Sequence, residues 1–166
     1  GVVLGYFAAT LVSEALVTVL IGLIGVIFAL NLLFRVKAGA AAKPANVAPG
    51  LFWGAVTGFT SFVSHSGGPP FQVYTLPLGL QKAVFAGTST IAFTYVNAIK
   101  LIPYYMLGQV NLASLEKVLV LMPVAALSVF AGVALVKRLP EALFFRLVTW
   151  ALLVVSAKLI WDGLHG

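Results

Sequence analysis

The amino-acid sequence predicts an all-α, polytopic helical membrane protein with two related, inverted repeats and a broken, re-entrant helix. Hydrophobic residues make up 61% of the chain and charged residues only 8%, whereas soluble domains carry about 25% charged residues. Several apolar segments approach the roughly 20 residues that a helix needs to cross a bilayer. One segment, residues 58–80, interrupts this pattern with hydroxyl side chains, glycines and prolines. Irregular backbone is tolerated at membrane depth only where protein or a water-filled cavity surrounds it.

The scarcity of polar and sulfur-containing residues excludes several classes of function. The chain has no cysteine, which excludes disulfides and thiolate metal sites. The net charge of +6 is interpreted as loop charge that sets orientation, and we expect no nucleic-acid partner. No metal-ligand spacing, no paired carboxylates within the spans and no phosphate-binding glycine loop occur. We therefore predict no catalytic residue, no metal and no cofactor.

The apolar segments predict the helices in chain order. The expected segments are residues 2–12 as the end of one span, 15–34 as a full span, 51–66 as a short apolar entry, and 82–106, 115–136 and 142–161 as further spans. Pro140 favours the start of the last of these helices. Trp161 is expected at an interfacial depth.

An internal repeat relates the two ends of the chain. Aligning Glu141 with Glu14 also aligns Leu159 with Leu32, within a similar outline of helix, turn and helix. We predict that residues 1–34 are the end of a first transmembrane repeat, 35–50 a charged cytoplasmic loop and 51–166 the second repeat. The counterpart of residues 58–106 would precede Gly1, so we expect the N-terminal repeat to be largely missing.

The placement of basic residues predicts the path of residues 51–80. If this segment crossed the bilayer, the two basic loops would fall on opposite sides, against the positive-inside rule. If it dips in and returns, the basic loop residues share one side and the nearly uncharged turn at 107–114 lies on the other. These basic residues are Arg35, Lys37, Lys43, Lys82, Lys137 and Arg138. We therefore predict a re-entrant segment.

The first group of candidate site residues lies in this re-entrant segment. The glycines Gly67 and Gly68 free the local amides, and a half-helix over residues 70–76 would aim its positive dipole end at them. That geometry favours an anion, with further hydrogen bonds from three polar side chains: Ser64, Ser66 and Gln72. His65 is interpreted as a donor, a proton carrier or a hydrogen-bonded core histidine. The alternative interpretation of Gly54, Gly58 and Ser61 is close helix packing.

The second group lies on the helix predicted over residues 82–106. Thr88 and Ser89 belong to a polar cluster, and Asn97 shares a helical face with neighbouring threonines. Lys100 borders this face. A cation within a span costs about 2.5–3.5 kcal/mol on insertion scales, so it faces a cavity or a partner, or it snorkels to the interface. Both interpretations stay open, as does local bonding of the threonine hydroxyls.

The order and spacing of these motifs resemble the second half of the TauE/SafE family of anion permeases. The motifs are Gly54-x3-Gly58-Phe59, the break at residues 64–70, Gly87-Thr88-Ser89, Asn97-x2-Lys100 and Gly132…Arg138-Leu139…Phe144. The resemblance runs from about residue 50 to the C-terminus, and residues 1–34 resemble the end of the family's first half. It implies an inner-membrane carrier of two related halves, whose members are associated with sulfite, sulfoacetate and other small anions. The family's first-half glycine-rich segment is absent from this sequence.

Together these observations predict a secondary transporter, not an enzyme, in the bacterial inner membrane. Its expected substrate is a small anion, sulfite or an organosulfonate such as sulfoacetate. The first group of residues would cradle the anion, His65 would titrate near neutral pH, and Lys100 would supply positive charge from the neighbouring helix. The expected partners are the anion and the lipid bilayer, with a homo-oligomer left open.

Two other functions compete with this prediction. One is a non-enzymatic membrane subunit that scaffolds a partner protein, in which the polar face would be a helix–helix interface. The other is a cation carrier. The absence of Asp and Glu between Glu14 and Glu116 argues against divalent cations, which prefer carboxylate ligands.

Overall fold

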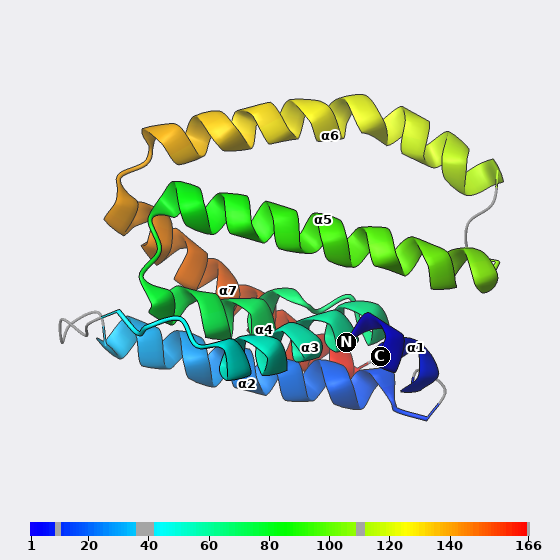
Figure 1. Ribbon diagram of the computed structural model, residues 1–166, viewed down its shortest axis with the longest axis horizontal. Helices are drawn as coiled ribbons and strands as arrows, with labels where there is room; N and C mark the ends of the chain where they lie inside the picture. Colours follow the sequence, from blue (N-terminus) through cyan, green and yellow to red (C-terminus); the bar gives the residue numbers. More distant parts are fainter. Residues whose placement is uncertain (9–10, 36–41, 109–111, 166) are drawn as a thin grey trace. The chain divides into compact units, whose positions relative to one another are not determined.

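The computed structural model describes the backbone of residues 1–8, 11–35, 42–108 and 112–165, and the side chains there except those of residues 35 and 112–117. Within these residues the chain forms seven α-helices, one short 3₁₀ helix and no strand (Figure 1). In chain order they are α1 (Val2–Ala8), α2 (Glu14–Arg35), α3 (Val47–Val63), α4 (Gly68–Thr75), the 3₁₀ helix η2 (Leu76–Leu78), α5 (Lys82–Met106), α6 (Leu112–Arg138) and α7 (Glu141–His165). The predicted all-α fold is confirmed.

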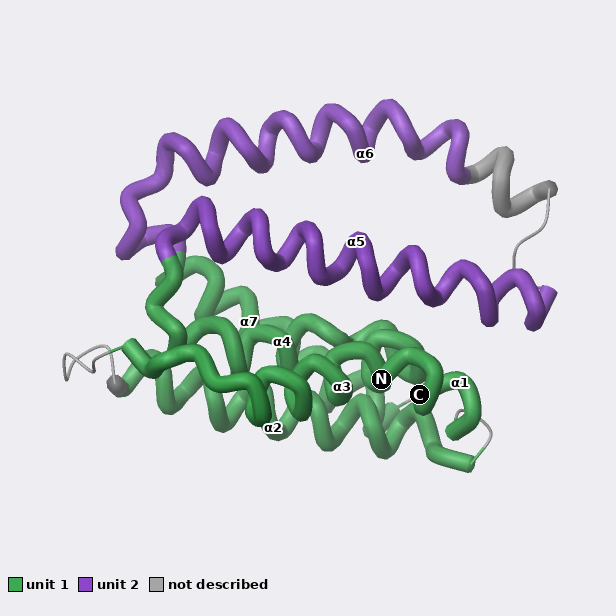
Figure 2. The backbone as a smooth tube through the Cα atoms, viewed as in Figure 1, with its two compact units in different colours: residues 1–80, 145–166 green, residues 81–144 purple. Residues whose placement is uncertain are grey.

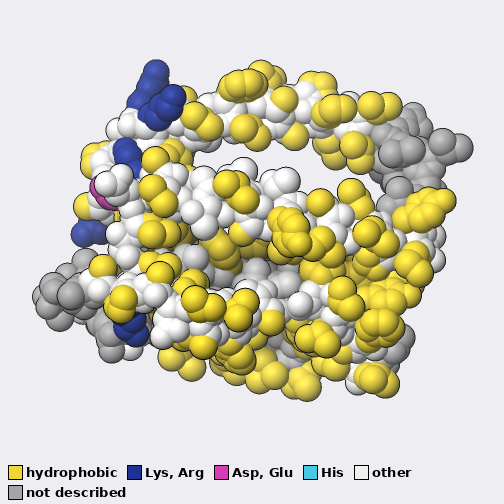
Figure 3. Space-filling view, in the orientation of Figure 1, with side chains coloured by type: hydrophobic (Ala, Val, Ile, Leu, Met, Phe, Trp, Pro, Cys, Tyr) yellow, Lys and Arg dark blue, Asp and Glu magenta, His cyan; other side chains and the backbone are white. Residues whose placement is uncertain are grey.

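Three of the described helices contain stretches long and apolar enough to cross a membrane: Glu14–Phe34, Val118–Arg138 and Glu141–His165. Helix α5 has the length, with 25 residues, but its hydroxyl residues, Asn97 and Lys100 lower its hydropathy. Helix α3 is shorter, with 17 residues, as the sequence predicted. Large apolar side chains are exposed along these helices, and hydrophobic atoms cover most of the described surface in view (Figure 3). Lipid is the solvent that such a surface requires.

The chain divides into two compact units (Figure 2). Unit 1 comprises residues 1–80 and 145–166, and unit 2 comprises residues 81–144. Unit 2 is the hairpin of α5 and α6 with the first residues of α7, and unit 1 holds the other helices and the rest of α7. The chain passes between the units after Leu80 and again after Phe144. The repeats proposed at residues 1–34 and 51–166 follow sequence similarity rather than contacts, and they stay a prediction.

Helices α3 and α4 form a re-entrant hairpin in unit 1. Helix α3 begins at Val47, before the predicted residue 51, because the Asn46 side chain accepts a hydrogen bond from the Ala48 amide at 3.1 Å, which caps the helix. After the break, α4 returns toward this starting point. The Tyr74 hydroxyl donates to the Asn46 carbonyl at 2.9 Å, and the Lys43 amide donates to the Pro77 carbonyl at 2.8 Å. The segment therefore ends beside the point where it begins, as predicted.

Glycines bring the helices of unit 1 into close contact. A Cβ built on Gly58 of α3 would lie 3.0 Å from the Val2 nitrogen of α1, and one built on Gly22 of α2 would lie 2.7 Å from the Ser156 carbonyl oxygen of α7. Small residues allow such approach in membrane helices. The packing interpretation is thus confirmed for Gly58, whereas a Cβ on Gly54 would meet nothing within 4 Å.

Basic loop residues occur in both units among the described residues. In unit 2 the Lys82 ammonium donates to the carbonyls of Lys137 and Leu139, so the start of α5 and the end of α6 share one end of the hairpin. In unit 1 Lys43 lies beside Pro77, which precedes Lys82 by a short stretch of chain. These hydrogen bonds place the basic residues at one end of the hairpin in unit 2, and the common side predicted for the basic residues of both units stays a prediction. The Arg35 side chain, Lys37 and part of the turn at 107–114 lie outside the described residues.

Candidate functional site

The first group of predicted site residues lies at the break between α3 and α4. Helix α3 ends at Val63 because Ser64 leaves the helical region, with φ −131°, and His65 adopts a left-handed φ of 53°. Helix α4 then begins at Gly68 with prolines in its first turn, where a missing N–H is tolerated. The predicted half-helix over residues 70–76 is therefore present as Gly68–Thr75.

The hydroxyl groups at the break donate to nearby carbonyls. Ser64 Oγ donates to the Thr60 carbonyl at 3.2 Å, and Ser66 Oγ donates to the Ser64 carbonyl at 2.7 Å. The Thr60 hydroxyl donates in turn to the carbonyl one helical turn earlier, at 2.9 Å. These hydrogen bonds stabilise the turn between α3 and α4, and each hydroxyl oxygen can still accept a hydrogen bond through its lone pairs. An anion bound by Ser64 or Ser66 would have to replace one of these carbonyls.

The amides of Gly67 and Gly68 are free donors at the break. Neither makes a hydrogen bond within the part of the chain that the structure describes, and the next amide, that of Phe71, donates to the Gly67 carbonyl at 3.3 Å. A Cβ built on Gly68 would meet nothing within 4 Å, so open space lies beside the start of α4. Free amides, open space and the positive end of a helix dipole suit an anion.

The start of α4 lies against the middle of two long helices of unit 1. A Cβ built on Gly25, near the middle of α2, would lie 3.2 Å from the Pro69 Cβ and 2.0 Å from the Ser156 Oγ of α7. Binding sites of secondary transporters lie near the bilayer midplane, at interrupted helices of this kind. The break is therefore at a suitable depth within unit 1.

Three buried side-chain oxygens of unit 1 lack hydrogen-bond partners among the described residues: Thr57 Oγ1, Gln72 Oε1 and Ser156 Oγ. Gln72 lies one turn after Gly68 on the same face of α4, and its buried Oε1 accepts no hydrogen bond within the described chain. Ser156 is fully buried, and its hydroxyl is likewise unpartnered there. Leaving such a group unsatisfied costs about 1–3 kcal/mol. Sequence analysis singled out Gln72 but missed Ser156, because a single serine on an apolar helix forms no pattern.

The second group of predicted site residues lies on α5 in unit 2. Lys100 is buried, with 6% of its surface exposed, and its Nζ lies 5.9 Å from the centroid of the Tyr104 ring. This is a cation–π contact. Both interpretations of Lys100, a cavity or partner within the membrane and snorkelling to the interface, stay predictions.

The other members of this group lie on two faces of α5. Ser89 is half-buried and shares a face with Lys100, since about 11 residues make three turns. Its hydroxyl donates to the Phe85 carbonyl at 2.8 Å, as such groups often do in helices. Thr88 and Asn97 are exposed. The helical face that carries Asn97 and its neighbouring threonines is therefore more exposed than the face that carries Lys100.

The two groups of site residues belong to different units. The first group, Ser64, His65, Ser66, Gly67, Gly68 and Gln72, lies in unit 1, and the second group, Thr88, Ser89, Asn97 and Lys100, lies in unit 2. That either group binds an anion stays a prediction. That the two groups form a single site stays a prediction.

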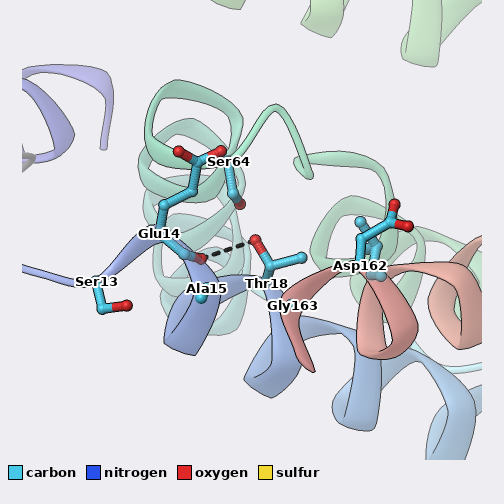
Figure 4. Close-up of a pocket in the computed structure, with 8 residues that line it drawn as sticks. Ser13, Glu14, Ala15, Thr18, Ser64, Asp162 and Gly163 are labelled. Atoms are coloured by element: carbon cyan, nitrogen blue, oxygen red, sulfur yellow. Dashed lines mark hydrogen bonds between the residues drawn. The ribbon is translucent and has the colours of Figure 1, made fainter. Parts of the chain in front are cut away.

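A cavity of about 510 Å³ lies beside Ser64 in unit 1 (Figure 4). It is lined by the start of α2, the end of α7 and the break: Ser13, Glu14, Ala15, Thr18, Ser64, Leu159, Asp162 and Gly163. The Thr18 hydroxyl donates to the Glu14 carbonyl at 2.8 Å, and Asp162 forms an ion pair with Lys158. The carboxylates of Glu14 and Asp162 disfavour an anion here, so the cavity differs in charge from the break.

The left-handed conformation of His65 yields a test of the break. This conformation costs a non-glycine residue about 1–2 kcal/mol, although histidine tolerates it better than most residues. We expect His65→Gly to be more stable than His65→Ala by about 1 kcal/mol, because both variants lose the ring and only glycine relieves the strain. Thermal unfolding of the two purified variants measures the difference. Equal midpoints would show that the backbone at residue 65 is not strained.

Comparison with protein families identifies the chain over nearly its whole length. The sequence profile described as sulfite exporter TauE/SafE matches residues 1–159. The match covers both groups of candidate site residues. Comparison with curated proteins and with solved structures gives no match.

Proposed function

Because the chain belongs to the sulfite exporter TauE/SafE family, which confirms the resemblance of its motifs, we propose that it is a secondary transporter of small anions in the bacterial inner membrane. The proposed substrate is sulfite or an organosulfonate such as sulfoacetate. The observation that carries this proposal is the break at Gly67 and Gly68. Two free amides there lie beside open space at the positive end of α4.

Each residue of the first group has a role in this proposal. The amides of Gly67 and Gly68 donate to the anion, and Gln72, one turn along the same face, adds a donor from its side chain. Ser64 and Ser66 hold the reversal that exposes these amides, through the hydroxyl bonds described above. His65, which is exposed, carries a proton between the site and the aqueous phase.

The second group supplies charge from α5. Lys100 neutralises the anion, and Thr88, Ser89 and Asn97 contribute hydrogen bonds. A buried cation has a high desolvation cost, which an anionic ligand offsets. The burial of Lys100 within the described structure supports this role.

The experiment that tests this proposal fills the open space beside the break. We expect Gly68→Leu to lower sulfite flux into protein-containing liposomes on the order of tenfold or more. The leucine side chain would occupy the space beside the amides and keep the anion from at least one charge-assisted hydrogen bond, which is worth about 1.5–3 kcal/mol. Gly132→Leu on α6 is the matched control, since a Cβ there also meets nothing within 4 Å. We expect its flux to equal that of the wild type.

Two results would contradict the proposal. Unchanged flux in Gly68→Leu, with normal thermal unfolding, would place the anion elsewhere. No anion flux from the wild type, with a stoichiometric protein partner in the purified sample, would favour the scaffolding subunit instead.

A further inference from the structure

Two hydrogen-bonded links join the start of α5 to the turn between α6 and α7 in unit 2. Glu141 Oε1 accepts a hydrogen bond from the Lys82 backbone amide at 3.1 Å. In return the Lys82 ammonium donates to the carbonyl of Leu139 and, at 3.3 Å, to that of Lys137. Both links therefore join residues that lie far apart in the sequence.

Each link satisfies groups that a helix end leaves free. The N-cap residue of α5, Gln81, makes no side-chain capping bond, so the Glu141 carboxylate takes over that role with the charge that the helix dipole favours. The Lys82 ammonium binds carbonyls at the end of α6, where positive charge is favoured. The two links thus stabilise both helix ends at once.

One turn after Lys82, an aromatic contact also joins α5 to the start of α7. The rings of Phe85 and Phe144 meet edge to face, with centroids 6.1 Å apart and planes at 75°. Phe85 is buried, with 6% of its surface exposed. One turn of α5 is thus held against the start of α7 by two kinds of contact.

We propose that Lys82 and Glu141 are positioning residues that set the depth of α5, and with it the depth of Lys100. Lys100 lies roughly 27 Å along α5 from Lys82, at 1.5 Å per residue. In that interval α5 carries no other charged residue that would hold it at a given depth. The role assigned to Lys100 rests on the proposed function, whereas the links themselves do not.

The links also lie where the chain passes between the units. One passage follows Leu80 and the other follows Phe144, so each is within a few residues of Lys82 or Glu141. The links therefore hold together, within unit 2, the two chain segments that continue into unit 1.

The test compares Glu141 variants with a matched glutamate. We expect Glu141→Ala to speed amide hydrogen exchange in the first turn of α5 about tenfold and to raise the KM for sulfite flux severalfold. Glu141→Gln keeps an acceptor and should restore most of both properties. Glu14→Ala is the control, because Glu14 also begins a long helix but its carboxylate accepts no hydrogen bond in the described chain. We expect it to leave both measurements unchanged.

A second pair of variants distinguishes a loss of positioning from a loss of folding. Lys82→Met should raise the KM in the same way, and Lys82→Arg should restore it by again donating to the carbonyls. Unchanged exchange in Glu141→Ala, or faster exchange with an unchanged KM, would overturn the positioning role. Absence of flux in the wild type would contradict the proposed function instead. In that case faster exchange in Glu141→Ala, with unchanged exchange in Glu14→Ala, would still show that Glu141 caps the start of α5.

Discussion

Replacing Gly22 with alanine is expected to lower the unfolding midpoint of the purified protein by several degrees. The added Cβ would lie 2.7 Å from the Ser156 carbonyl oxygen and 2.9 Å from the Ile160 nitrogen of α7. These are backbone atoms, which cannot rotate away as a side chain can, so α2 and α7 must move apart. Forcing extra volume into packed helices costs about 1–3 kcal/mol. Thermal unfolding followed by circular dichroism in detergent measures this change.

The control for this prediction is Gly54→Ala on α3. A Cβ at this position would meet nothing within 4 Å, and alanine is favoured over glycine in a helix by about 0.8–1 kcal/mol. We expect its midpoint to equal or exceed that of the wild type. Because helices in lipid associate largely through close packing, a normal midpoint for Gly22→Ala would mean that α2 and α7 are not packed as described.

Replacing Lys100 with methionine is expected to reduce anion flux on the order of tenfold to a hundredfold. This range corresponds to losing one charged hydrogen bond, about 1.5–3 kcal/mol. Methionine keeps the apolar stem of the side chain and removes only the charge. Initial rates of sulfite uptake into liposomes measure the effect, and Lys100→Arg, which keeps the charge, should retain part of the flux.

The matched control is Lys158→Met on α7. The Lys158 side chain is 71% exposed and pairs with Asp162, so its charge is solvated and worth little to stability. We expect wild-type flux from this variant. Wild-type flux from Lys100→Met as well would mean that Lys100 serves packing against Tyr104 rather than binding an anion.

Much of the fold was predictable from local signals. Helix α5 occupies residues 82–106 as predicted, because proline, glycine and polar residues mark its start and end. The half-helix α4 followed from the glycines and prolines at residues 67–70, whose backbone preferences are intrinsic. The return of the re-entrant segment followed from the distribution of lysine and arginine, which hydropathy alone does not show.

Other features were not predictable, because they depend on residues distant in the sequence. Helix α3 begins early because Asn46 caps it, and Tyr74 then fixes the return of α4. Sequence analysis noted Glu141 only for its alignment with Glu14, whereas the structure shows that its carboxylate caps α5. The position of Ser156 of α7 directly against Gly25 of α2 could not be predicted from the sequence.

The sequence by itself determined that lipid surrounds this protein, where its helices lie and that one of them is broken. These properties follow from hydropathy and backbone preference, which each segment carries alone. Tertiary structure decided which polar groups stay available. The hydroxyl groups of Ser64 and Ser66 donate to carbonyls, and Lys100 is buried. The amides of Gly67 and Gly68 make no hydrogen bond to any residue that the structure describes. Such pairings depend on which groups folding brings within hydrogen-bond distance, and only the folded chain specifies them.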